Sequence, residues 1–388
     1  MIYLDNAATT KLHPFVLEEM LPFMNGNYGN PSSLYELATI SKNAIEHARQ
    51  IIANAIEAKP EEIYFTGGGS EADNWAIKAV CDANKKKGNH IITTKIEHHA
   101  VLHTCEYLEK HGYEVTYLDV GEQGIVDVKA LRKAIRPTTI LISVMYANNE
   151  IGTIQPIEQI SQIAREKGIY FHTDGVQAFG QIPISVKKQG FDMLSVSAHK
   201  FHGPKGVGFL YVRSKVKIQS FIHGGHQEKG LRAGTQNVAG IVGMGKAAQI
   251  AMETMKERVK RERELRDYLI GRVYREIPYV RLNGHRNMRL PGNANFSFQF
   301  IEGEAIVLLL DMEGICTSSG SACTAGLHSP SHVLMALGMP EEIAYGSLRV
   351  TLSGETTKEE IDILMVKLKQ IVSQLRKKSG AYERYLRH

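Results

Sequence analysis

Hydrophobic and polar residues follow two alternating patterns along residues 16–248. Segments with the period of an amphipathic helix are separated by short apolar runs, which are typical of buried strands. The helical segments are 41–58, 73–85, 100–111, 128–135 and 157–167, and the apolar runs are 63–65, 90–94, 114–118, 140–145, 170–173, 191–196 and 207–212. This alternation predicts βαβ units and a mostly parallel sheet, with functional residues at the carboxyl ends of the strands.

A different pattern begins near Met252, where a long charged helix opens. The elements predicted beyond it are strands at 293–299 and 347–352, helices at 303–312, 331–337 and 358–377, and a loop of small residues at 316–327. We interpret this change as a second, smaller α+β domain that carries the small-residue loop. Residues 16–255 are therefore expected to form a large domain, and residues 1–15 with 256–388 the small one.

The composition is that of a globular protein, with 43% hydrophobic and 22% charged residues among 388. A net charge of +5, with no basic stripe outside the tail, predicts neither a nucleic acid nor a membrane partner. The N-terminus lacks a secretion signal and no apolar run could span a membrane, so a cytoplasmic location is expected. Four cysteines without a CxxC pair argue against a disulfide framework and a four-cysteine zinc site, and no metal site is expected.

The most informative position is Lys200, which follows the apolar run 191–196 and precedes a Gly/Pro loop. An ammonium group at the end of a buried strand is costly to desolvate and tends to lose its proton. That property suits a lysine that acts as a nucleophile or forms a Schiff base. Taken by itself, the residue has an alternative reading as a surface lysine in a loop.

Two further strand ends carry residues suited to an anion or a ring. The sequence Gly-Gly-Gly-Ser-Glu at 67–71 lies between a strand and a helix, where backbone N–H groups can form an anion cradle; the alternative is a tight structural turn. His98 follows the run 90–94 and is interpreted as a catalytic or ring-stacking imidazole, with a loop histidine as the alternative. A metal pair with His99 is disfavoured because adjacent side chains point in different directions.

Asn149 and Asp174 complete the set of strand-end residues. A buried carboxylate needs a cation or several donors, and no arginine lies near Asp174 in the sequence. A protonated ring nitrogen of a cofactor would serve, and a helix cap is the alternative role. Phosphate cradle, stacking histidine, pyridinium carboxylate and Schiff-base lysine together predict pyridoxal phosphate, an electron sink for a carbanion at the substrate's α-carbon.

With these residues, the chain resembles the NifS/IscS-like cysteine desulfurases, in the class V aminotransferase group of fold type I. The matching motifs cover nearly the whole chain and are Tyr-Leu-Asp-Asn-Ala-Ala-Thr-Thr at 3–10, Tyr-Gly-Asn-Pro-Ser-Ser at 28–33, Ser-Ala-His-Lys at 197–200, Arg-Ala-Gly-Thr at 232–235, Ser-Ser-Gly-Ser-Ala-Cys at 318–323 and Arg349. The resemblance implies an α/β fold of the pyridoxal-phosphate-dependent transferases, with a mostly parallel sheet of the seven-stranded type.

The resemblance also implies three catalytic residues. Lys200 would be the Schiff-base lysine and the proton shuttle, and His98 would stack on the ring and act as an acid or base. Cys323 would be the nucleophile, carried on a loop of small residues that bury little apolar surface. The other cysteines are expected to be structural: Cys81, Cys105 and Cys316.

The cofactor and substrate residues follow in the same way. Asp174 would pair with the ring nitrogen, Gln177 would bond the ring oxygen, and Asn149 would lie near that oxygen and the substrate. Arg349 would bind the substrate carboxylate through two parallel hydrogen bonds. The phosphate would be held by Gly69, Ser70, Ser197, His199 and, from the neighbouring subunit, Thr235, which implies a homodimer.

The implied reaction removes sulfur from L-cysteine, releases L-alanine and leaves a persulfide on Cys323. The sulfur would pass to an acceptor protein, such as a scaffold for iron–sulfur assembly, or to a thiolation partner. The basic tail 376–388 is one candidate docking site, and a solvated terminus is the alternative. Other readings are a selenocysteine lyase, a class V aminotransferase and a non-catalytic scaffold, and the last is disfavoured because Lys200, Asp174 and Cys323 are all present.

Three positions depart from the usual pattern of these desulfurases. Ser70 stands where many relatives have threonine, a change that keeps a hydroxyl group at the cradle. Tyr35 stands where a histidine often follows the 28–33 motif. His226 occupies a position where a glycine or another small residue is expected.

Overall fold

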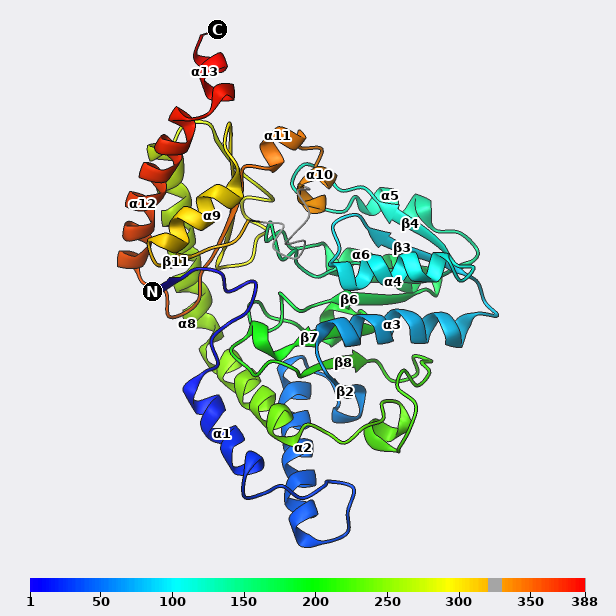
Figure 1. Ribbon diagram of the computed structural model, residues 1–388. Helices are drawn as coiled ribbons and strands as arrows, with labels where there is room; N and C mark the ends of the chain where they lie inside the picture. Colours follow the sequence, from blue (N-terminus) through cyan, green and yellow to red (C-terminus); the bar gives the residue numbers. More distant parts are fainter. Residues whose placement is uncertain (320–329, 388) are drawn as a thin grey trace.

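A seven-stranded sheet forms the centre of the computed structural model, which describes residues 1–319 and 330–387 (Figure 1). The strands are β2 (Ile63–Thr66), β3 (His90–Thr94), β4 (Glu114–Leu118), β5 (Thr139–Ser143), β6 (Tyr170–Asp174), β7 (Met193–Ser197) and β8 (Gly208–Val212). Their order is β2-β8-β7-β6-β5-β3-β4, and only β8 runs antiparallel to its neighbours β2 and β7. The predicted α/β fold with a mostly parallel sheet is confirmed.

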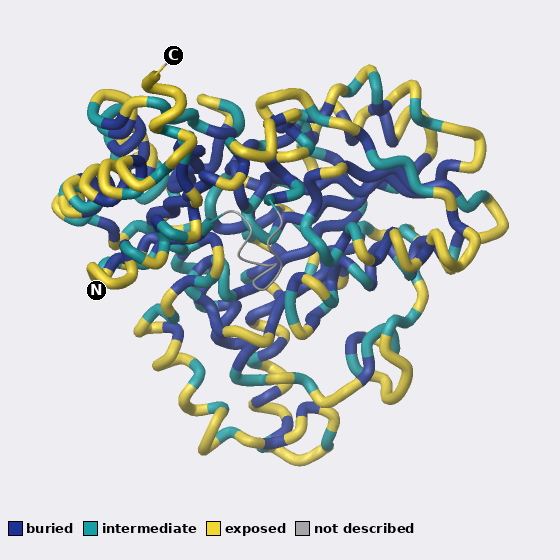
Figure 2. Tube along the Cα trace, turned by 45° about the horizontal axis from the view of Figure 1, so that its top comes forward, coloured by how far each residue is buried: buried dark blue, intermediate teal, exposed yellow. Residues whose placement is uncertain are grey.

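Helices cover both faces of this sheet. They are α1 (Pro14–Met24), α2 (Glu36–Ala55), α3 (Gly69–Asn84), α4 (His99–Glu109), α5 (Val128–Ala134), α6 (Ile157–Lys167) and α7 (Val186–Gln189), with the 3₁₀ turns η1 (Pro60–Glu62), η2 (Ala198–Lys200) and η3 (Gln227–Gly230). α3 and α4 bury Trp75 and Val101 on one face, and α2 and α6 bury Ile52 and Ile160 on the other. The central strands are buried along most of their length because both their faces are covered (Figure 2).

A second core is built from residues near both ends of the chain. Its elements are β1 (Ile2–Tyr3), β9 (Val280–Leu282), β10 (Asn293–Phe298), α9 (Gly303–Met312), β11 (Ile315–Cys316), β12 (Ser347–Thr351) and α12 (Lys358–Lys377). The short helices α10 (His332–Ala336) and α11 (Glu341–Ala344) pack instead in a separate cluster with Ile96, Met145 and Ile151, and the terminal helix α13 (Gly380–Leu386) buries no residue. The strands form an antiparallel sheet of order β12-β10-β9 and a parallel pair of β1 and β11. α12 packs Leu364 and Leu368 with Phe296 and Leu348 of the sheet.

Helix α8 (Val238–Glu276) connects the two cores (Figure 1). Its first half lies beside α1 and α2 and places Met244 in the core of the large sheet. Its second half carries Leu269 and Ile270 into the other core. A single continuous helix therefore belongs to both packing units.

The first half of α8 was not predicted, because its small residues carry no helical signal. The helix begins at Val238, whereas the charged pattern placed its start near Met252. Gly243 and Gly245 are buried within it, and a Cβ atom on Gly245 would lie 2.7 Å from the Cβ of Ala48 in α2. Glycine lowers helix propensity, yet here it allows two helices to approach closely, and the packing outweighs the propensity.

Several predicted elements begin and end where the sequence pattern placed them, among them β3, β4, α6, α9 and α12. The short strands β1 and β9 and the terminal helix α13 were not predicted, because such short segments carry too little periodicity. Of the helices in residues 1–319 and 330–387, none is both long and apolar enough to cross a membrane.

Candidate active site

Lys200 lies in η2, directly after β7, at the edge of the sheet where β6 and β7 end. Its Nζ donates hydrogen bonds to the carbonyl oxygens of residues 7–8, at 2.6 and 2.8 Å. Its positive charge acts on the acidities of His98, which follows β3, of Asp174, the last residue of β6, and of its own neighbour His199, and in each case it favours a lower pKa. The structure therefore brings four of the predicted residues into one site.

The N-terminal residues 7–10 form one wall of this site, although no role was predicted for them. The carbonyl oxygen of Ala7 accepts hydrogen bonds from Lys200 and from Nε2 of Gln177, the latter at 3.0 Å. The hydroxyl group of Thr9 lies 3.1 Å from Nδ1 of His199. These contacts fix the segment around Lys200 and hold the Gln177 amide at the site.

The glycine turn before α3 closes against β7 in the manner of an anion cradle. A Cβ atom on Gly69 would lie 2.6 Å from Cγ2 of Val176 and 3.5 Å from Cβ of Ser197, so no larger residue fits there. Gly68 has a φ of 154°, a conformation that favours glycine. The first N–H groups of α3 have no acceptors within the helix, which suits phosphate binding by Gly69, Ser70 and Ser197.

An ion pair braces this turn. Glu71, in the first turn of α3, accepts hydrogen bonds from Arg232 at 2.9 and 3.1 Å and from the N–H of Gly67 at 2.8 Å. Thr235 follows on the same segment and is exposed. Within residues 1–319 and 330–387 no hydrogen bond joins Thr235 to the cradle of its own chain. The structure therefore does not unite Thr235 with the other predicted residues in a single chain.

Asp174 and His98, the two ionisable groups beside Lys200, have strongly shifted pKa values. Burial raises the pKa of Asp174 to about 6, although a hydrogen bond from the N–H of Val176 and the charge of Lys200 oppose the shift. Burial and the charge of Lys200 lower the pKa of His98 to about 4. Nδ1 of His98 accepts a hydrogen bond from the N–H of Ala100 at 3.1 Å. At neutral pH His98 is therefore an uncharged imidazole whose proton is on Nε2.

Arg349 approaches the site from β12 and is only 4% exposed. Its Nη1 donates a hydrogen bond to the carbonyl oxygen of Asn149 at 3.1 Å, and its Nη2 donates one to Asp5 at 2.8 Å. Its Nε is buried and has no hydrogen-bond partner in the described part of the chain. A buried guanidinium with donors to spare suits the carboxylate of a ligand.

The predicted nucleophile, Cys323, lies outside the described residues. The beginning of its motif lies beside Arg349, the predicted substrate residue, because the backbone of Ser318 exchanges hydrogen bonds with that of Arg349 at 2.6 and 3.2 Å. The remaining cysteines are Cys81 and Cys105, which are buried in α3 and α4 as expected, and Cys316, which is partly buried in β11. Burial raises the thiol pKa of Cys81 and Cys105, so neither is a reactive thiolate.

The residues at this edge of the sheet fit pyridoxal phosphate. The cradle at Gly69 has no room for a side chain and presents N–H groups, as a phosphate requires. Asp174 is a buried carboxyl group with a raised pKa, so a cationic ring nitrogen would stabilise its charged form. Lys200 supplies an amine at the end of the neighbouring strand, where it can react with the aldehyde group of the cofactor.

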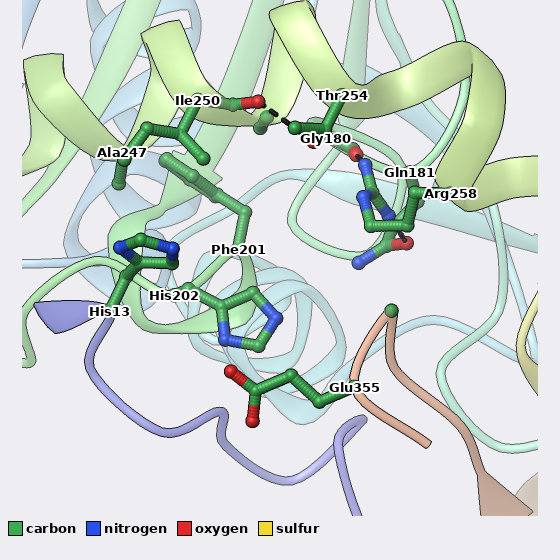
Figure 3. Close-up of a pocket in the computed structure, with 12 residues that line it drawn as sticks. His13, Gly180, Gln181, Phe201, His202, Ala247, Ile250, Thr254, Arg258 and Glu355 are labelled. Carbon is green, nitrogen blue, oxygen red and sulfur yellow. Dashed lines mark hydrogen bonds between the residues drawn. The ribbon is translucent and has the colours of Figure 1, made fainter. Parts of the chain in front are cut away.

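A separate pocket lies behind the Lys200 segment, between α8, the turn at 201–202 and the loop before α12 (Figure 3). It has a volume of about 220 Å³ and an apolar floor that includes Phe201 and Ile250. His13, His202 and Glu355 line its rim. None of the predicted site residues lines it, so this pocket is distinct from the cofactor site.

A buried polar cluster lies next to Asp174 and was not predicted. It consists of Asp73 on α3, His172 on β6, Ser143 on β5 and Ser195 on β7. One signal was present in the pattern: residues 172 and 174 are two apart in a strand, so their side chains share a face. The position of Asp73 depends on how α3 packs on the sheet, for which the sequence has no local signal.

The whole chain is similar to known desulfurases. The family model for class V aminotransferases matches residues 2–364. A cysteine desulfurase IscS from Clostridium botulinum (strain Hall) is 55% identical over 389 aligned positions, which cover 100% of this chain and 98% of the relative. A cysteine desulfurase IscS from Methanosarcina thermophila is 54% identical and covers 97% of this chain and 93% of its own length.

Solved structures agree with these relatives. A structure described as a NifS-like protein superposes with a TM-score of 0.91 at 40% identity, over 96% of this chain and 100% of the other. A structure described as SspA in complex with cysteine has a TM-score of 0.81 at 37% identity, over 92% of this chain and 100% of the other. The chain therefore belongs to the class V aminotransferase family, among its pyridoxal-phosphate-dependent cysteine desulfurases.

Proposed function

We propose that this cysteine desulfurase uses Lys200, His98 and Cys323 to remove the sulfur of L-cysteine, with L-alanine as the product. The observation that supports these roles is the position of one ammonium group. Besides burial, the charge of Lys200 lowers the pKa of His98, which follows β3, and of its neighbour His199, and it opposes the raised pKa of Asp174 at the end of β6. A lysine that several strand ends surround in this way is suited to act on a cofactor and a substrate held between them.

The cofactor residues divide by the part of pyridoxal phosphate that each would contact. Bound pyridoxal phosphate supplies an electron sink for the electrons released at the α-carbon of the substrate. Asp174 would pair with the ring nitrogen, Gln177 and Asn149 would contact the ring oxygen, and His98 would stack on the ring. The phosphate would be held by Gly69, Ser70, Ser197, His199 and the Thr235 of a second copy of the chain.

Arg349 would bind the carboxylate of L-cysteine. Two of its five N–H groups already donate to Asn149 and Asp5, and its Nε–H has no partner among the described residues. The ion pair with Asp5 holds the guanidinium in place before the substrate arrives. A planar guanidinium offers two parallel donors, so it also orients the α-carbon toward Lys200.

Proton transfer would fall to two residues. Lys200 would take the proton from the α-carbon of the substrate, because its amine is the group fixed at the end of β7. His98 has its proton on Nε2 and a pKa of about 4, so it is uncharged at neutral pH and can donate or accept a hydrogen bond at the substrate.

Sulfur transfer would follow at Cys323. The thiolate of Cys323 attacks Sγ of the substrate, a sulfur–sulfur bond forms, and the bond between Cβ and Sγ breaks. The electron pair of the broken bond stays on Cβ, which then takes up a proton to give the methyl group of alanine. Lys200 would return to the α-carbon the proton that it removed. The products are L-alanine and a persulfide on Cys323, so atoms and electrons balance without an added oxidant or reductant.

The persulfide sulfur would next pass to a nucleophilic acceptor. We propose a scaffold protein for iron–sulfur assembly, or a thiolation partner, as that acceptor, and the cytoplasm as the location.

The two cores joined by α8 support a division into a large domain at 16–255 and a small domain at 1–15 and 256–388.

A single-turnover reaction of the purified holoenzyme with L-cysteine tests the proposed nucleophile. Without reductant, we expect about one alanine per site and a mass gain of one sulfur on the peptide that contains Cys323. Cys323→Ser should lose both products while its cofactor absorbance still changes on adding L-cysteine. Cys316→Ser is the matched control and should behave like the parent. Alanine formed equally by Cys323→Ser would contradict the assignment.

We also propose that the protein works as a homodimer with shared sites. Thr235 is exposed, and in the part of the chain that the structure describes no hydrogen bond joins it to its own cradle. α1 with the segment after it exposes Phe15, Leu17, Leu21, Met24 and Leu34. Such a run of exposed apolar residues is typical of an interface. Sedimentation equilibrium should give twice the chain mass of 43.2 kDa. A mass equal to one chain would contradict the shared site.

A further inference from the structure

The imidazole of His172 sits at the centre of a fully buried polar cluster below Asp174. Its Nδ1 lies 2.9 Å from Oγ of Ser143, and its Nε2 lies 2.9 Å from Oγ of Ser195. The carboxyl Oδ1 of Asp73 lies 3.6 Å from the same Nε2. His172 is 0% exposed and Asp73 is 1% exposed, so water does not stabilise a charge on either group.

Asp73 reaches this cluster from α3, one turn after the glycine cradle. His172 and Asp174 point to the same side of β6 because they are two residues apart, and Asp174 is in register with Ser195 of β7. Asp73 therefore lies close to Asp174, and the negative charge of Asp174 contributes to the raised pKa of Asp73. The ionisable groups around Asp73 are His172 and Asp174 on β6 and Glu97 after β3.

None of these neighbours supplies a positive charge to Asp73. Burial lowers the pKa of His172 to about 3, so its imidazole is uncharged at neutral pH. Burial raises the pKa of Asp73, and the charges of Asp174 and Glu97 raise it further, whereas a hydrogen bond with Ser195 lowers it. Oδ1 of Asp73 also lacks a hydrogen-bond partner among the described residues. An ionised Asp73 would therefore be a second buried negative charge beside Asp174, offset by the hydrogen bond with Ser195 but by no cation among these neighbours.

We propose that Asp73 is a positioning residue for Asp174, held as an uncharged carboxylic acid within the His172 cluster. The two aspartates then carry a single negative charge, which resides on Asp174 at the cofactor side. As an uncharged acid, Asp73 supports Ser195 and His172 without drawing the charge of Asp174 away from the ring nitrogen. The functional part of this inference rests on the proposed role of Asp174, whereas the protonation of Asp73 does not.

The isosteric variant Asp73→Asn tests the protonation through the sign of a pH dependence. A folded-state pKa above the unfolded value means that the folded chain binds more protons, so this group lowers stability as pH rises toward the folded pKa. Asparagine does not titrate, so the variant should gain stability relative to the parent as pH rises from about 5 to 8. The ratio of the two unfolding constants should change by up to about tenfold per pH unit.

Urea unfolding of both holoenzymes measures this ratio, with Glu62→Gln as the control. Glu62 is also a buried carboxyl group, but hydrogen bonds from Ser214 and Lys59 lower its pKa. Above about pH 5 Glu62 is ionised in both the folded and the unfolded chain, so the stability difference between Glu62→Gln and the parent should stay constant from about pH 5 to 8. A difference between Asp73→Asn and the parent that is likewise constant over this range would overturn the proposal, because it would show that Asp73 is ionised in the folded protein.

Two further readouts separate a positioning role from bulk stability. Asp73→Asn should keep the cofactor absorbance and a turnover within about threefold of the parent, since it preserves shape and charge, whereas Asp73→Leu should lose cofactor. Loss of cofactor by Asp73→Asn as well would contradict the proposal.

If Asp73→Asn does not fold, infrared spectra of the parent labelled with carbon-13 aspartate test the protonation of Asp73 directly. A protonated aspartate at neutral pH would support the proposal, and its absence would refute it.

Discussion

Lys200→Ala is expected to lower the rate of alanine formation from L-cysteine by a factor on the order of 10⁴. Alanine has no amine to react with the cofactor aldehyde or to move the proton at the α-carbon of the substrate. Lys200 is also the residue whose Nζ is fixed by the carbonyl groups of residues 7–8 at the end of β7. Steady-state alanine formation measures the loss, and absorbance after dialysis shows whether the cofactor remains attached.

Lys205→Ala is the matched control for this result. Lys205 follows on the same loop but is exposed, so its removal should change the rate by less than about twofold. The melting temperature of Lys200→Ala should stay near that of the parent, because the loss is chemical rather than structural. A Lys200→Ala enzyme that keeps a tenth or more of the parent rate would refute the role of Lys200.

Asp174→Asn is expected to weaken cofactor binding by about 2–5 kcal/mol, or roughly 30- to 5,000-fold. The substitution keeps the shape of the side chain and its hydrogen bond with the N–H of Val176, but it removes the charge that would face the ring nitrogen. Equilibrium dialysis with pyridoxal phosphate gives the dissociation constant directly. Asp192→Asn is the control, because Asp192 is also largely buried but lies at the start of β7, beside Arg213.

The same carboxyl group predicts a pH dependence of cofactor binding. The pKa of Asp174 is raised to about 6 by burial, so the group loses its charge as pH falls through that value. Cofactor affinity of the parent should therefore fall below about pH 6, and the affinity of Asp174→Asn should lack this decline. Equal affinities of parent and variant at neutral pH would contradict the pairing of Asp174 with the ring nitrogen.

Much of the site could be predicted because it lies at strand ends. An apolar run marks each strand, and in a mostly parallel sheet the residues that follow such runs collect at one edge. That rule placed Lys200 and Asp174 together, and the glycine turn before α3 followed from its position between a strand and a helix. These residues needed no long-range information beyond the topology of the sheet.

Other parts of the site depend on contacts that have no local signal. The carbonyl groups of residues 7–8 bind Lys200 through the backbone, which does not depend on residue type. Asp73 meets His172 only because α3 packs across β6, and the two are far apart in the sequence. The start of α8 was not predicted for a related reason. Its glycines permit close packing with α2, but glycine has a low helix propensity.

The antiparallel strand β8 has a consequence for the order of folding. β2, which leads into the proposed phosphate cradle, lies at the edge of the sheet and pairs with β8, with Ile63 opposite Tyr211. On the ribosome, β2 emerges long before the strand that it pairs with, and closing so long a loop is entropically costly. The cradle therefore reaches its final geometry only after β8 has been synthesised and inserted, so a nascent chain acquires its cofactor site late.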